Sequence, residues 1–208
     1  MELKQLFENS LENSFSYQEY RTFVTDLLQD GKSTGNTQSE ALLHYSQLNE
    51  VRMNRLEKTL TLLPEVQAGF ESLQKKYIAL VISEGWCGDA AQSIPVFNLM
   101  ESNISAIEFR YVLRDENESL MNQFLTNGSR SIPKLVLLEK ETHRMIGDWG
   151  PRPEAAAKLI IDYKAEHGVI DETAKINLQK WYLQDKGISV QNELLSIFKN
   201  NEQLITTA

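Results

Sequence analysis

Apolar residues recur along this chain in two spacings, and each spacing predicts a different kind of element. Apolar positions three and four residues apart predict two amphipathic helices in the first third, one opened by the Ser16–Glu19 capping box and one from about Glu40. A continuous apolar run at residues 77–83 predicts a buried strand, and an alternating run at residues 107–113 predicts another. Helical spacing returns in the last third, so the pattern predicts an α/β core between helical extensions.

The second N-terminal helix is expected to bury one apolar face and to carry two arginines beside it. The residues expected to point inward are Leu42, Tyr45, Leu48, Val51 and Leu56. Arg52 and Arg55 follow the same stretch, and two interpretations stay open. They form a docking face for an anion or an acidic partner, or they are solvated charges whose aliphatic stems cover the core. Residues 60–63 are compatible with a short first strand or with the end of this helix.

The segment Trp86–Pro95 (WCGDAAQSIP) joins the buried strand to the next helix and contains the chain's single cysteine. Cys87 is expected in the first turn of that helix, where free backbone amides and the helix dipole favour a thiolate. Cysteines in such positions have pKa values of roughly 3.5–7.5. The carboxylate of Asp89 acts in the opposite direction, so the sequence leaves the sign of the net pKa shift open.

The remaining pattern predicts a hairpin followed by three helices. Residues 134–138 and 143–148 form the expected antiparallel hairpin. A helix is expected from Pro151 or Pro153 to Gly168, and two further apolar-periodic stretches follow it. The apolar content of these stretches is too high for a disordered tail.

Two motifs resemble those of the thioredoxin family. Trp86-Cys87-Gly88, with Pro95 eight residues after the cysteine, resembles the family's active-site motif. The segment from Arg130 to Pro133 resembles its R-x-I-P segment, in which the proline is cis and lies against the active-site sulfur. The resemblance covers about residues 66–168, and the whole layout is similar to a group of bacterial thioredoxin-like proteins. It implies a three-layer α/β/α sandwich with a mixed sheet, plus N-terminal and C-terminal helical extensions.

The same resemblance divides the chain and assigns a site. We expect a helical N-terminal extension over residues 1–63, a thioredoxin-like domain over 64–168, and a C-terminal helical tail over 169–208 packed on that domain. Cys87 is the expected catalytic residue. The residues expected to bind substrate are Trp86, Gly88, Asp89, Ile132, Pro133 and Trp149. In the family, the backbone before the cis-proline pairs with an extended substrate segment.

Departures from the family motif leave three functions open. The position of the family's second cysteine is Ala90, and the position of its buried acid is Val81. One hypothesis is monothiol redox chemistry, in which Cys87 reacts with a protein or peptide disulfide, or with a small thiol, and an external thiol completes the exchange. The second is a non-catalytic binding module for a peptide or protein partner. The third is an oxidation sensor.

Composition narrows the cellular setting and the partners. With 21 Lys and Arg against 29 Asp and Glu, the net charge of −8 disfavours nucleic acid as a partner. The chain lacks a secretory apolar stretch near Met1 and any run of ~20 apolar residues, so we expect a cytoplasmic protein without a membrane partner. His44, His143 and His167 lie far apart, and no nucleotide-binding motif is present. We therefore expect neither a metal nor a cofactor.

Overall fold

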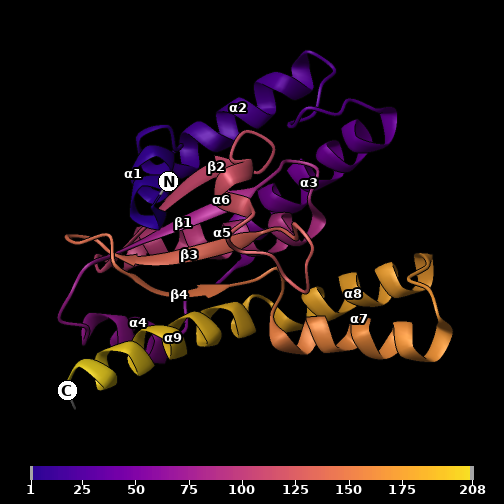
Figure 1. The fold of residues 1–208 in the computed structure, drawn as a ribbon. Coiled ribbons are helices and arrows are strands. Elements are labelled where there is room, and N and C mark those ends of the chain that lie inside the picture. Colours follow the sequence, from indigo (N-terminus) through magenta and orange to yellow (C-terminus); the bar gives the residue numbers. More distant parts are fainter. Residues whose placement is uncertain (1, 207–208) are drawn as a thin grey trace.

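A four-stranded mixed β-sheet with helices on both sides forms the centre of the molecule (Figure 1). The computed structural model describes residues 2–206 and the side chains of residues 2–202. The strands are β1 (Tyr77–Ser83), β2 (Ile107–Leu113), β3 (Lys134–Glu139) and β4 (Met145–Trp149). In the order β2-β1-β3-β4, β1 runs parallel to β2 and antiparallel to β3, and β4 is antiparallel to β3. The predicted α/β sandwich with a mixed sheet is confirmed.

Helical extensions precede and follow this sheet. The helices are α1 (Leu3–Glu12), α2 (Tyr17–Gln29), α3 (Glu40–Thr59), α4 (Pro64–Glu71), α5 (Gly88–Asn103), α6 (Glu118–Met121), α7 (Glu154–His167), α8 (Glu172–Asp185) and α9 (Ile188–Thr206). The predicted capping box opens α2, since the Ser16 side chain accepts from the Glu19 backbone and Glu19 accepts from the Ser16 backbone. Within the described residues, no helix has the length and apolarity needed to cross a membrane.

Aromatic side chains fix the helices against the sheet. Phe97 of α5 stacks on Phe109 of β2 at 5.1 Å between ring centroids and meets Trp149 of β4 edge-on at 5.9 Å. Phe198 of α9 packs on Tyr77 of β1 at 4.8 Å, so α9 lies on the same face as α5. Figure 1 shows α1 and α6 across the sheet from α4 and α9. These two faces give the three layers.

The N-terminal extension is continuous with the main hydrophobic core. Tyr20 of α2 is buried and stacks on Tyr111 of β2 at 5.4 Å. Phe15 exchanges two backbone hydrogen bonds of 2.8 Å with Tyr111, so one residue pairs with the outer edge of β2. Residues 60–63 form neither the strand nor the helix end that the sequence allowed, because α3 ends at Thr59 and the chain then runs irregularly to α4.

The predicted inward face of α3 is wrong except at Leu56. Tyr45, Leu48 and Val51 are 42%, 39% and 69% exposed. Instead, α3 buries Ser46, Asn49, Met53 and Leu56. Polar groups can occupy this face because they find partners there: the Ser46 hydroxyl lies 2.7 Å from the Ser33 hydroxyl, and Asn49 Nδ2 donates to the Gly85 carbonyl at 2.9 Å.

Helices α7 and α8 form a separate helical hairpin beyond the end of the sheet (Figure 1). Its buried side chains form a second cluster of their own, apart from the main core. The members of this cluster are Ala156, Ile160, Ala174, Leu178 and Tyr182. The hairpin α7–α8 therefore depends on its own small core and on the contacts it makes with α5.

Candidate functional site

The turn between β1 and α5 is held by the N-terminal extension. The Gly85 backbone N–H donates to Thr34 Oγ1 at 2.8 Å, and the Gly85 carbonyl accepts from Asn49. Both contacts are buried, so each polar group of this glycine has a protein partner. The turn delivers Cys87 to the N-cap position of α5.

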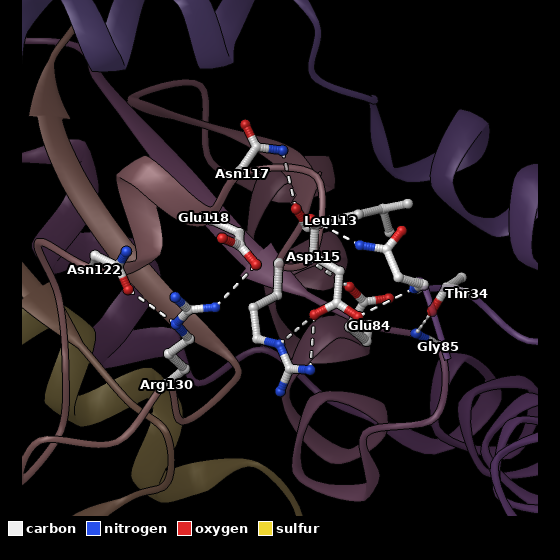
Figure 2. Close-up of polar contacts among 12 residues, drawn as sticks. Thr34, Glu84, Gly85, Leu113, Asp115, Asn117, Glu118, Asn122 and Arg130 are labelled. Atoms are coloured by element: carbon white, nitrogen blue, oxygen red, sulfur yellow. Dashed lines mark hydrogen bonds and ion pairs between the residues drawn. The ribbon is translucent and has the colours of Figure 1, made fainter. Parts of the chain in front are cut away.

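A buried carboxylate ties the ends of β1 and β2 together beside this turn (Figure 2). Glu84 is fully buried, and its Oε1 accepts from the Asp115 backbone N–H at 3.0 Å. Burial raises the pKa of Glu84. Arg114 pairs with Asp115 at 2.8 Å, and its guanidinium carbon lies 4.8 Å from the centre of the Trp86 ring. This network fixes the loops that flank the cysteine.

Cys87 is directed towards the predicted proline turn and is nearly enclosed. The residue is 7% exposed, and its Sγ donates to the Ile132 carbonyl at 3.2 Å. The Ile132–Pro133 peptide bond is cis. Burial and the nearby Asp89 carboxylate raise the pKa of the Cys87 thiol to about 12. The backbone amides of the first helical turn and Arg152 lower the pKa but are outweighed, so the thiol is protonated at neutral pH.

Asp89 connects the site helix to the helical hairpin α7–α8. Its Oδ2 forms an ion pair with Arg152 Nη2 at 2.8 Å, and its Oδ1 accepts from the Tyr182 hydroxyl at 2.9 Å. Burial raises the pKa of Asp89, whereas Arg152 and Tyr182 lower it. One turn further along α5, Gln92 donates to Gln179 of α8 at 2.8 Å. Asp89 is thus a structural link as well as the acid beside the sulfur.

A pocket of about 1070 Å³ opens over the cysteine, between α3, the start of α5, the proline turn and α8. Five of the residues expected at the site line it: Trp86, Cys87, Gly88, Asp89 and Ile132. The other two expected residues, Pro133 and Trp149, do not line the pocket. Pro133 is buried, and Trp149 is buried against Phe97 and donates from Nε1 to Glu193 at 2.6 Å. From the loop that follows Trp149, Pro151 and Arg152 border the pocket.

The sequence interpretation missed the two helical walls of this pocket. On α3, Leu42, Tyr45 and Leu48 line it, although their spacing had indicated a core face. On α8, Ile176 and Leu183 line it and are 48% and 58% exposed. The apolar stripe followed by Arg52 and Arg55 was the available signal. A stripe facing a pocket and a stripe facing a core have the same spacing in sequence.

The pocket wall combines one thiol with an excess of cationic groups. Seven Arg and Lys side chains line it, against two carboxylates. The residues that the structure describes contain no group of three or more His, Cys, Asp or Glu side chains able to hold a metal ion. Ala90 follows Cys87 by three residues in the first turn of α5, and no other cysteine exists in the chain. The arrangement can bind a ligand beside a thiol, but it cannot form a disulfide within one molecule.

Comparisons with known proteins agree with this fold. A family model described as thioredoxin (Thioredoxin_9) matches residues 35–165. A protein of unknown function from Pseudomonas aeruginosa, PA1234, has a similar crystal structure, with a TM-score of 0.58 and 18% identity over 89% of this chain and 98% of that chain. An HIV epitope scaffold gives a TM-score of 0.56 and 18% identity over 85% and 97% of the two chains. No curated protein matches the sequence. At this identity the structural matches establish the fold.

Proposed function

The chain belongs to the thioredoxin family, and we propose that it is a binding member of that family rather than a dithiol oxidoreductase. The pocket over Cys87 takes a ligand non-covalently, and Cys87 contributes an uncharged thiol to the wall. This proposal follows from the protonation state of the Cys87 sulfur. A nucleophilic cysteine acts as its thiolate, whereas here burial and Asp89 raise the pKa of Cys87 to about 12.

The hydrogen bond from Cys87 Sγ to the Ile132 carbonyl is the single observation that supports this function most strongly. The carbonyl accepts from a thiol and repels a thiolate, so the contact stabilises the protonated form. The same carbonyl belongs to Ile132, the residue before the cis-proline. In the thioredoxin family, the backbone at this position pairs with an extended substrate segment. In this protein that oxygen is already partnered by the cysteine.

Fragment binding followed by NMR tests the proposal, because two tryptophans report on two places. The indole of Trp86 lines the pocket, whereas the indole of Trp149 is buried and donates to Glu193. We expect fragments that bind to shift the Trp86 indole signal and to leave the Trp149 signal unchanged, in the native protein and in Cys87→Ala alike. Shifts that disappear in Cys87→Ala, or that map away from the pocket, would contradict a binding site independent of the thiol.

Monothiol exchange is the second candidate, and the position of Cys87 on the pocket wall beside the proline turn favours it. In this reaction the Cys87 sulfur attacks a disulfide, forms a mixed disulfide and releases one thiol. An external thiol then attacks the mixed disulfide, which restores Cys87 and releases the second half as a new disulfide. The substrate is a protein or peptide disulfide, and a small thiol can supply the external thiol of the second step.

Incubation with glutathione disulfide separates the two candidates. The binding function predicts no glutathione adduct on the folded protein at neutral pH, and rapid adduct formation once the chain is unfolded in urea. The unfolded sample shows that the reagent is active, and Cys87→Ser shows that any adduct is on this residue. An adduct on the folded protein that is absent in Cys87→Ser would favour monothiol exchange and end the binding-only account.

A further inference from the structure

Exposed apolar side chains gather on the two helices that face each other across the pocket. Tyr45 and Leu48 of α3, with Leu42, form one apolar strip, and Ile176 and Leu183 of α8 form the other. Scattered exposed apolar residues are ordinary, but a contiguous group in a concave site marks a place where an apolar surface docks. These two strips suit a flat or extended apolar group held between them.

Cationic side chains that form no ion pair with the described residues lie on the same walls. Of the pocket cations, Arg152 pairs with Asp89 and Lys175 pairs with Glu172. Arg52, Arg55 and Lys180 form no ion pair with any residue that the structure describes. This local excess of positive charge stands out in a chain whose net charge is −8.

Arg52 is the most informative of these cations. It is half-buried, Asn49 Oδ1 accepts from its Nη1 at 2.8 Å, and it lies beside the first residue of α5. Burial and the neighbouring Arg55 lower the pKa of Arg52 by more than Asp89 and Tyr45 raise it, so the guanidinium is held where its charge is disfavoured. An anion bound next to it would offset that penalty. Guanidinium groups also match the geometry of phosphate and carboxylate groups.

We propose that the pocket binds a small amphipathic anion, with its apolar body between the α3 and α8 strips and its phosphate or carboxylate group on Arg52 and Arg55. This inference rests on the proposed binding function and names the class of ligand. The pocket volume of about 1070 Å³ is sufficient for that class, since sites for drug-sized ligands enclose roughly 300–1,000 Å³.

Calorimetric titrations with matched ligands test this class. The probes are 1-naphthyl phosphate and 1-naphthoate, which combine both features, inorganic phosphate, which has only the charge, and 1-naphthol, which has only the apolar ring. We expect at least one of the two combined probes to bind at least tenfold more tightly than inorganic phosphate and 1-naphthol. Comparing the affinities of 1-naphthyl phosphate and 1-naphthoate identifies the preferred anionic group. Binding of 1-naphthol as tight as the better combined probe, or tighter binding of an oligoglutamate peptide, would overturn the proposal.

Variants on α3 provide matched controls for each half of the site. Arg52→Gln with Arg55→Gln should weaken binding of the tighter combined probe at least tenfold, whereas Lys58→Gln removes a charge from the same helix outside the pocket and should leave it unchanged. Leu48→Ser should weaken binding, whereas Val51→Ser, also exposed on α3 but outside the pocket wall, should not. An equal loss of affinity in a pocket variant and in its control would refute the placement of the ligand on that pocket residue.

The same titrations distinguish failure of this inference from failure of the binding function. If fragments shift Trp86 but neither naphthyl anion binds, the ligand class is wrong and the binding function stands. If neither the fragments nor the naphthyl anions shift the Trp86 indole signal of the native protein, the binding function itself is wrong. We expect the fragments and the tighter combined probe both to shift this signal.

Discussion

The two helical walls of the pocket are attached to the protein in different ways. Helix α3 places Met53 and Leu56 in buried positions, and its Asn49 holds the backbone of the β1–α5 turn. Helix α8 buries Ala174, Leu178 and Tyr182 in the small cluster it shares with α7. It reaches the site helix through hydrogen bonds from Tyr182 to Asp89 and from Gln92 to Gln179.

This difference indicates which wall can move. Segments with few buried apolar contacts open with a smaller free energy than segments of the main core. We therefore expect the α3 wall to open only with the whole protein, whereas the helical hairpin α7–α8 can shift while the sheet stays folded. Such a shift widens the pocket without disturbing the turn that holds Cys87.

Truncation of Met53 should give the largest effect on global stability. Met53 is 6% exposed and belongs to the main core, so Met53→Ala leaves a cavity that the surrounding sheet and helices cannot fill. We expect the free energy of unfolding, measured by urea denaturation, to fall by roughly 3 kcal/mol. A loss under about 1 kcal/mol would show that α3 is not part of the cooperative core.

Leu178→Ala is the matched change in the other wall, because Leu178 is also 6% exposed but lies in the α7–α8 cluster. We expect faster amide hydrogen exchange in α7 and α8, equivalent to roughly 2 kcal/mol of local opening, with exchange in the strands unchanged. If the urea transition instead shifts as much as in Met53→Ala, the hairpin and the sheet form one cooperative unit and the comparison fails.

Tyr182→Phe should have the smallest effect of the three. The change removes only the hydroxyl that donates to Asp89 and keeps the ring in the hairpin cluster. A hydrogen bond of this kind contributes about 1 kcal/mol, so exchange in α8 should rise several-fold. Tyr163→Phe is a control, because it removes a hydroxyl on the outer side of the hairpin that bonds Asp171. It should leave exchange at the contact between α5 and α8 unchanged.

Much of this architecture could be predicted because it depends on local sequence. The apolar run of β1, the capping box of α2 and the motifs at Cys87 and Pro133 each specify an element within a few residues. The starts of α2 and α3 followed from the same local signals. The mixed sheet then followed from the resemblance that those motifs carry.

The pocket walls could not be predicted, because they depend on where helices distant in sequence pack. The apolar spacing of Tyr45 and Leu48 is the same whether they face a core or a pocket, and buried Asn49 needed a partner that only the fold supplies. The direction of the Cys87 pKa shift could not be predicted for the same reason. The local helix turn lowers it, and burial by the Ile132 segment, together with Asp89, raises it.

Asp89 offers a way to sharpen the account of the sulfur. Its carboxylate is the second cause of the raised pKa of Cys87 after burial. Asp89→Asn removes that charge, so the pKa of Cys87 should fall but stay above the ordinary value for cysteine, because burial is the larger cause. An unchanged pKa in this variant would contradict a role for Asp89 in keeping the thiol protonated.

The pKa of Cys87 itself tests the central claim most directly. With one cysteine in the chain, the ¹³Cβ signal of labelled cysteine gives a single titration curve in NMR. The account predicts that this signal stays in its thiol position through neutral pH and titrates only towards pH 12. A transition at or below about pH 8.5, the range of an unperturbed or activated thiol, would contradict it.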